Sequence, residues 1–166
     1  MKAAKAFTLI EVLVVVLILG ILAAIVVPQT SSASMTAKAS ALAQDLRATR
    51  THLAVYASQH DDVPPGYPAN GGAPDSDTFV QQMTMSSDQT GTVQPVGTPG
   101  FNFGPYWLRA PMNPLNQKDT VRIIADGAAF PADPTDADGW VYQPDTLTFR
   151  ADNVGQDDNG TRYFDY

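Results

Sequence analysis

The chain opens with a long apolar stretch, in which residues 7–27 read FTLIEVLVVVLILGILAAIVV and hold one ionisable side chain, Glu11. About 20 apolar residues suffice for a helix to cross a bilayer. Lys2 and Lys5 precede this stretch, and no Lys or Arg follows it until Lys38. Because positive charge gathers on the cytoplasmic side of a membrane helix, the pattern predicts a single-pass helix over residues 7–29, with the N-terminus in the cytoplasm and the remainder outside.

A cleaved secretory signal peptide is the alternative interpretation of this stretch. Lys2 and Lys5 would be its charged start, residues 12–27 its apolar part and the small residues 31–34 its cleavage region. The apolar part of such a peptide runs to about 7–15 residues, so composition alone leaves both interpretations open. Glu11 favours the membrane helix, because a carboxylate within an apolar segment costs about 2.5–3.5 kcal/mol on insertion, and a signal peptide has no use for it.

A helical pattern resumes after Pro28 and continues over residues 30–60, which contain neither Pro nor Gly. Apolar side chains recur there at intervals of three, four and seven residues, at Met35, Ala39, Leu42, Leu46, Leu53 and Tyr56. These intervals mark one face of a helix. We therefore expect the helix to continue through Pro28 as an amphipathic half, with a kink or local melting between Gly20 and Pro28. A helix that ends at Val27 is the alternative.

Residues 61–166 have the pattern of a small α+β head. We expect a short helix over Phe79–Met85, capped from within Asp75–Asp77. The aromatic and Pro-rich block 103–114 is interpreted as a packed turn rather than an exposed binding surface. Three strands are expected, at Thr120–Ala125, Trp140–Gln143 and Leu147–Ala151, with a turn at Pro144–Asp145 between the last two. The predicted fold is a long N-terminal helix packed on a small antiparallel sheet.

The charge distribution excludes several classes of function. Beyond residue 37 the chain holds eight Lys or Arg against sixteen Asp, and the whole chain has a net charge of −7 and no Cys. So acidic a head repels phosphate backbones, which argues against nucleic-acid binding. No phosphate-binding loop, activated nucleophile or zinc pair is present in the sequence, so no enzyme is expected. His52 and His60 are interpreted as ordinary surface residues.

The end of the chain is its most acidic part. Residues 126–165 contain nine Asp and two Arg. Asp152, Asp157, Asp158 and Asp165 are candidate ligands of Ca²⁺, which takes six to eight oxygen ligands. A solvated acidic loop is the alternative, and no other cofactor is expected.

The residues around the start of the apolar stretch resemble the signal of prepilins, the precursors of type IV pilin-like proteins. The string is Lys5–Ala6 followed by Phe7-Thr8-Leu9-Ile10-Glu11. In that family a prepilin peptidase cuts on the cytoplasmic side just before the Phe, which is then N-methylated. The resemblance implies a leader over residues 1–6 and methylation of Phe7. This chain departs from the family at Ala6, where the pattern has Gly, and Ala is the closest substitute in size.

Glu11 would be the fifth residue of the mature chain, and the resemblance gives it a role in assembly. Filament formation packs such helices side by side, away from water. An unpaired carboxylate is unfavourable there, and the N-terminal ammonium of a neighbouring subunit would neutralise it. Gly20 and Pro28 are further assembly residues in this interpretation, since pilin-like proteins commonly carry a Pro at the position of Pro28.

The head also carries a resemblance, to the major pseudopilins of type II secretion. It rests on residues 104–114 and on Gly139-Trp140-Val141-Tyr142-Gln143-Pro144. This implies a subunit of a periplasmic pseudopilus anchored in the inner membrane. Its partners would be other copies of the chain, minor pseudopilins, the prepilin peptidase and an inner-membrane assembly platform. Pseudopilins of this kind bind calcium in their C-terminal loop. A surface pilus subunit and a membrane-anchored binding module are the alternatives.

Overall fold

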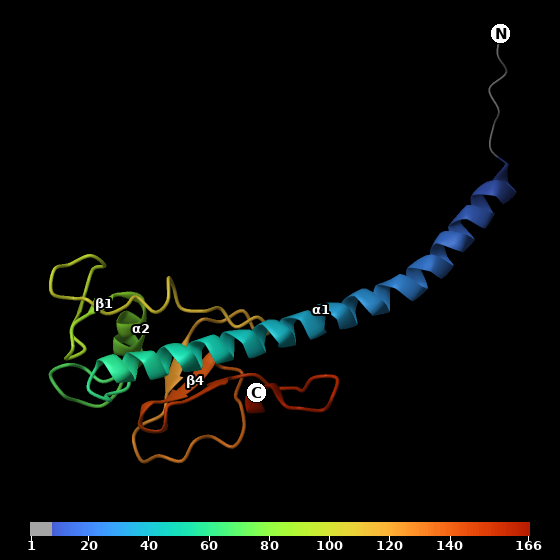
Figure 1. The fold of residues 1–166 in the computed structure, drawn as a ribbon. Helices are drawn as coiled ribbons and strands as arrows, with labels where there is room; N and C mark the ends of the chain where they lie inside the picture. Colours follow the sequence, from blue (N-terminus) through green and yellow to red (C-terminus); the bar gives the residue numbers. More distant parts are fainter. Residues whose placement is uncertain (1–7) are drawn as a thin grey trace, which may run out of the picture. The chain divides into compact units, whose positions relative to one another are not determined.

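The computed structural model describes residues 8–166, with the side chains of residues 24–33 left out, and it is drawn in Figure 1. The chain divides into two compact units, Met1–Ala37 and Lys38–Tyr166. Its helices are α1 (Leu9–Gln59) and α2 (Ser76–Thr84). Its strands are β1 (Ser86–Ser87), β2 (Val93–Gln94), β3 (Val121–Ile123), β4 (Trp140–Gln143) and β5 (Thr148–Ala151). Two short 3-10 helices are η1 (Pro144–Thr146) and η2 (Tyr163–Asp165). The α+β class predicted from the sequence is confirmed.

The helix expected on both sides of Pro28 is one element. α1 contains 51 residues and continues past Pro28, which confirms the predicted continuation. Gly20 has open space where a Cβ would lie. The side chain of Pro28 lies outside the described residues, so the kink between these two positions stays a prediction.

The predicted membrane segment, residues 7–29, falls only partly on the described residues, because Phe7 and the side chains from residue 24 onwards lie outside them. In the part of the chain that the structure describes, no helix combines the length and the apolar character needed to cross a membrane.

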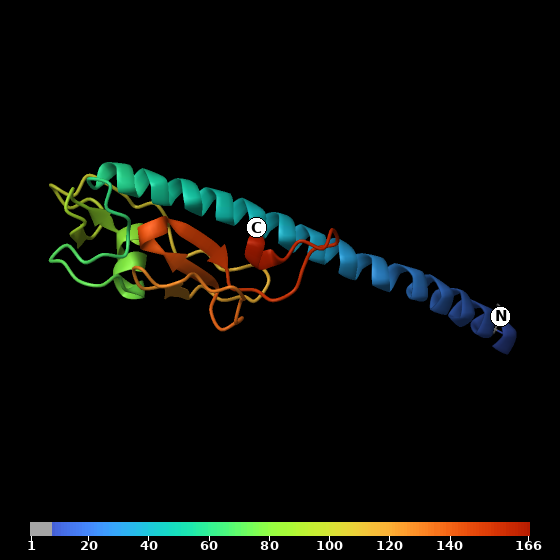
Figure 2. The same ribbon diagram turned by 90° about the horizontal axis from the view of Figure 1, so that it is seen from below.

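The C-terminal half of α1 forms one wall of the head core, and Figure 2 shows the sheet lying along it. The predicted apolar face is buried from Ala39 onwards, at Ala39, Leu42, Leu46, Leu53 and Tyr56. Met35, which was predicted on the same face, is 43% exposed. Thr49 is buried as well and fills the seven-residue gap between Leu46 and Leu53, because positions three and four apart share a helix face.

The short helix α2 is confirmed, and it starts a turn earlier than expected. Asp75 is its N-cap and accepts a hydrogen bond from the Thr78 backbone N–H at 2.8 Å. Phe79 and Met83, one turn apart, are fully buried in the same core as α1. The cap fixes where α2 begins, and the two apolar side chains fix which face it turns inward.

The three-stranded sheet differs from the expected one in the direction of one pair. β4 and β5 pair antiparallel, as predicted, with η1 as the turn between them. β3 and β4 pair parallel, with Val121 opposite Trp140, so the prediction of a wholly antiparallel sheet is wrong. Residues 124–139 connect this pair, and parallel strands need such a long crossover, whereas a tight turn forces antiparallel pairing.

The aromatic block 103–114 is a packed turn, as predicted. The backbone N–H groups of Tyr106 and Trp107 both donate to the Met83 carbonyl, at 3.0 and 2.8 Å. Trp107 is buried, and the Trp140 indole N–H donates to the Pro111 carbonyl at 2.8 Å. The block thus joins α2 to the sheet.

His60 is not a surface residue, contrary to the sequence interpretation. It is buried at the end of α1, where its ring stacks on Tyr56 with 3.7 Å between centroids. Nδ1 lies 2.7 Å from the Tyr56 carbonyl and Nε2 lies 2.9 Å from Ser87 Oγ. His52 is partly buried. The sequence could not indicate the burial of His60, because the segments that cover it come from β1 and from Phe103.

Candidate functional site

The first described turn of α1 is closed by a reciprocal pair of hydrogen bonds. The Thr8 backbone N–H donates to Glu11 Oε2 at 3.4 Å, and the Glu11 backbone N–H donates to Thr8 Oγ1 at 3.3 Å. This is a capping box, in which side chains accept hydrogen bonds from amide groups at a helix start; the Glu11 N–H also donates to the Thr8 carbonyl at 3.1 Å. Thr8 is a residue that the sequence interpretation missed, although the spacing Thr-x-x-Glu is the known signal for such a cap.

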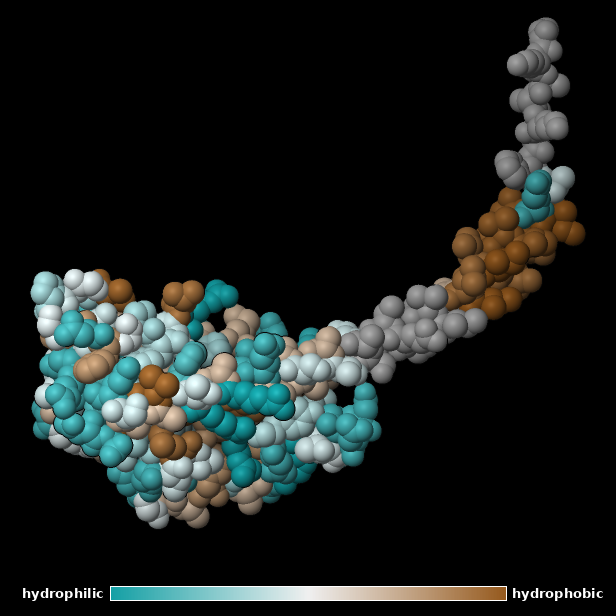
Figure 3. All heavy atoms as spheres, viewed as in Figure 1, coloured by the Kyte–Doolittle hydropathy of each residue, from teal (hydrophilic) through white to brown (hydrophobic). Residues whose placement is uncertain are grey.

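Glu11 stands on a helical surface that is otherwise apolar. From Leu9 to Leu22 the large apolar side chains are between 45% and 85% exposed, and Figure 3 shows this segment as a brown surface. Among the ion pairs of the described residues, none involves Glu11. A helix that is apolar all round needs lipid or other helices to cover it, and the carboxylate would be enclosed with it.

The predicted processing residues cannot be placed. Ala6 and Phe7 lie outside the described residues, as does the side chain of Pro28. The described assembly residues are Glu11 and Gly20, both exposed along α1.

Asp152 lies inside the head and is fully buried. Its carboxylate accepts hydrogen bonds from the Thr135 backbone N–H and hydroxyl, both at 2.7 Å, and from the Asp138 N–H at 3.1 Å. Arg122 lies 3.4 Å away. Burial alone would raise the pKa of Asp152, but these hydrogen bonds and Arg122 outweigh it and hold the pKa below its ordinary value.

The other three aspartates of the tail have different surroundings. Asp157 accepts the backbone N–H groups of Asn159 and Thr161 and the hydroxyl of Tyr166. Asp165 pairs with Arg150 and Arg162, at 2.9 and 3.5 Å. Asp158 is exposed. The hydroxyl of Tyr166, followed by the Thr161 N–H, lowers the pKa of Asp157.

These four carboxylates do not fit a shared calcium ion as they are placed. Among the described residues, no group of three or more His, Cys, Asp or Glu side chains is arranged to hold a metal. Asp152, Asp157 and Asp165 each accept hydrogen bonds or pair with arginines instead. Calcium binding by the tail stays a prediction.

The start of the chain matches a known family. Residues 1–27 match the model of the prokaryotic N-terminal methylation motif, which defines the class as proteins with a prepilin-type N-terminus. The chain is also 31% identical to type II secretion system core protein G of Pseudomonas aeruginosa over 130 residues, which cover 76% of this chain and 78% of that protein. The chain therefore belongs to the core protein G family of pseudopilins. No solved structure matches it.

Family membership confirms two expectations from the sequence. Proteins of this family are structural filament subunits and not enzymes. The chain is therefore a structural protein, and the pseudopilin interpretation of its head is confirmed.

Proposed function

We propose that this chain is a structural subunit of a type II secretion pseudopilus and that it polymerises through the N-terminal half of α1. The observation that carries the proposal is Glu11, a single carboxylate on an exposed and otherwise apolar helix. Side-by-side packing of such helices removes their apolar surface from water. The same packing buries Glu11, which then needs a positive partner.

The partner that we propose is the N-terminal ammonium of a neighbouring copy. Cleavage between Ala6 and Phe7 would create this ammonium next to the apolar segment, four residues before Glu11. The ammonium of one subunit and Glu11 of its neighbour come together at only one relative position along the filament axis. Their pairing would therefore fix the axial position of each added subunit. Methylation of Phe7 would keep the positive charge. Gly20 and Pro28 would allow α1 to adjust its backbone as neighbouring helices pack.

Before assembly, the same segment would hold the chain in the inner membrane. Lys2 and Lys5 lie before the apolar stretch and Lys38 is the next basic residue, which favours a cytoplasmic N-terminus and a periplasmic head. The proposed partners are other copies of this chain, minor pseudopilins, a prepilin peptidase and an inner-membrane assembly platform.

Overproduction in cells that carry a type II secretion system tests this function. We expect filaments containing the chain, and an intact mass of the membrane-purified protein that lacks Met1–Ala6 and carries one added methyl group. A mature chain that begins near Ser34 would indicate a cleaved signal peptide and contradict the proposal. A correctly processed chain that forms no filament would favour a membrane-anchored binding module. Long surface filaments would favour a pilus subunit.

A further inference from the structure

Guanidinium groups from three elements gather at the end of the chain. Arg50 lies on α1, Arg150 lies on β5, and Arg162 precedes η2. We refer to these three residues as the arginine cluster. Their partners are oxygen atoms and aromatic rings of β5, of the C-terminal segment and of the loop before β4.

Arg150 holds the last 3-10 turn against the sheet. Its Nη1 lies 2.9 Å from Asp165 Oδ1 and donates to the Phe164 carbonyl at 3.4 Å. The guanidinium carbon lies 5.3 Å from the ring centroid of Phe164 and 5.4 Å from that of Phe130. A cation at this distance from an aromatic face is attracted by the ring quadrupole.

Arg162 joins the same turn to the loop before β4. It pairs with Asp165 at 3.5 Å and with Asp133 at 3.2 Å, and it donates to the Ala132 carbonyl at 3.0 Å. Its guanidinium also lies 5.7 Å from the centroid of Phe164. One side chain therefore connects two segments that are about thirty residues apart in sequence.

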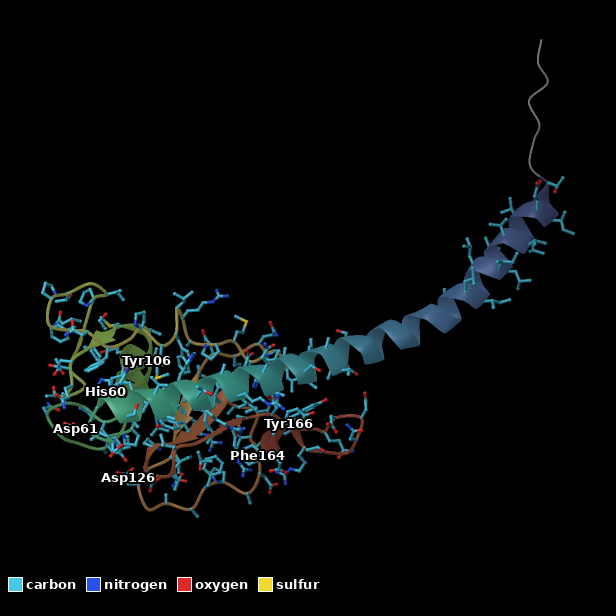
Figure 4. The ribbon with its side chains drawn as sticks, in the orientation of Figure 1. His60, Asp61, Tyr106, Asp126, Phe164 and Tyr166 are labelled. Carbon is cyan, nitrogen blue, oxygen red and sulfur yellow. The ribbon has the colours of Figure 1, made fainter. Side chains whose placement is uncertain are left out.

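Arg50 connects the C-terminal segment to the long helix. It donates twice to the Phe149 carbonyl, at 3.2 and 2.9 Å, and once to the Tyr166 main-chain oxygen at 2.5 Å. Figure 4 shows Phe164 and Tyr166 beside α1. Through Arg50, the helix, β5 and the end of the chain are held at one point.

Three of the four candidate aspartates, Asp152, Asp157 and Asp165, already accept hydrogen bonds or pair with arginines. Calcium takes six to eight oxygens from carboxylates and main-chain carbonyls. Asp165 and the carbonyls of Phe149 and Phe164 accept from the arginine cluster, and Asp152 is enclosed by donors from Thr135 and Asp138.

We propose that the arginine cluster does in this chain what a bound divalent cation would do, and that the head keeps its C-terminal segment in place without calcium. These contacts are made by side chains of the chain itself, so a chelator cannot remove them. The proposal concerns the head alone and does not rest on the filament function.

Thermal unfolding of the full chain in detergent tests the proposal. Trp107 and Trp140, the two tryptophans, are both buried in the head, so their fluorescence reports head unfolding. We expect the wild type to melt at the same temperature in millimolar CaCl₂ and in EGTA at matched ionic strength. Arg150→Gln and Arg162→Gln should each lower the melting temperature by about 3–6 °C in both buffers.

Arg109→Gln is the matched control, because Arg109 is exposed and makes no hydrogen bond or ion pair with the described residues. It should melt like the wild type. Two results would overturn the proposal: a higher melting temperature of the wild type in CaCl₂ than in EGTA, or arginine-cluster variants that melt like Arg109→Gln. If Arg150→Gln does not fold, the more exposed Arg162→Gln still decides between these outcomes.

Discussion

At the scale of single residues, Asp152 is a buried carboxylate held by several donors in the head. It is fully buried, and Thr135, Asp138 and Arg122 surround its carboxylate with donors. Asn153 beside it is buried too and accepts a hydrogen bond from buried Asn113. A buried polar network of this kind is stabilising only while its members keep their partners.

Asp152→Asn should therefore destabilise the head far more than an exposed substitution does. The amide nitrogen of Asn would face either the Thr135 N–H and Arg122 or the Thr135 hydroxyl and the Asp138 N–H. In both cases Arg122 loses its buried negative partner. We expect a loss of about 3 kcal/mol in the free energy of unfolding. Urea denaturation followed by tryptophan fluorescence measures it. Asp119→Asn, at an exposed residue, is the control, and equal losses in both variants would contradict the account.

His60 should make the head less stable as the pH falls from neutral. Burial lowers the pKa of His60, although the Tyr56 carbonyl and Asp88 oppose that effect. The folded head therefore binds fewer protons than the unfolded chain once the pH falls below about 6.5, and its stability is lost as the pH approaches the lowered pKa. The same sign holds for Asp152 in a lower window, below about pH 4.

The urea midpoint between pH 8 and pH 5 checks this expectation for His60. It should fall in the wild type and change less in His60→Gln. Identical pH profiles of the two proteins would show that His60 is not the group responsible.

At the scale of elements, the two halves of α1 have different roles. Leu46 is 1% exposed in the head core, whereas Leu13 is 58% exposed on the apolar N-terminal surface. Leu46→Ala removes buried apolar atoms and leaves a cavity, so it should reduce head stability by about 2–5 kcal/mol. Leu13→Ala should leave head melting unchanged, measured by tryptophan fluorescence. A similar loss of head stability in both variants would contradict the different roles of the two halves of α1.

Beside the parallel pair β3–β4, the backbone of Gly139 lies close to the backbone of Lys118. A Cβ on Gly139 would meet the main-chain oxygen and carbon of Lys118, the carbon at 2.8 Å. Gly139→Ala should push β4 away from the segment before β3 and destabilise the head by about 1–3 kcal/mol. Gly20→Ala, with open space around its Cβ, should leave head melting as it is. If Gly139→Ala also melts like the wild type, the close approach to Lys118 does not exist in solution.

At the scale of the whole molecule, patterns that depend on neighbours in sequence were predictable, and those that depend on distant segments were not. The continuation of α1, the cap at Asp75 and the β4–β5 turn follow from local spacing and were all confirmed. The parallel direction of β3 depends on how residues 124–139 cross the sheet. The burial of His60 depends on β1 and Phe103, which lie far along the chain.

The candidate functional residues also fall into those that the sequence could predict and those that it could not. Glu11 was identifiable because its apolar surroundings are its own sequence neighbours. The partners of the acidic tail were not, since Arg50 reaches Tyr166 only after the chain has folded. Sequence clustering of Asp therefore predicted a shared ion but could not indicate the separate donors that the structure places around Asp152, Asp157 and Asp165; the calcium site stays a prediction.

The central claim, assembly through a charge at Glu11, is tested most directly by filament formation of Glu11→Gln. Gln can still close the capping box with Thr8, but it carries no charge for the neighbouring ammonium. Electron microscopy of overproducing cells should show at least about tenfold fewer filaments than the wild type, since 1.4 kcal/mol per subunit already changes an equilibrium tenfold. Thr8→Ala, which removes the cap and keeps the carboxylate, should still assemble. Wild-type filament numbers in Glu11→Gln, with loss of filaments in Thr8→Ala, would show that Glu11 acts only as a helix cap and would contradict the account.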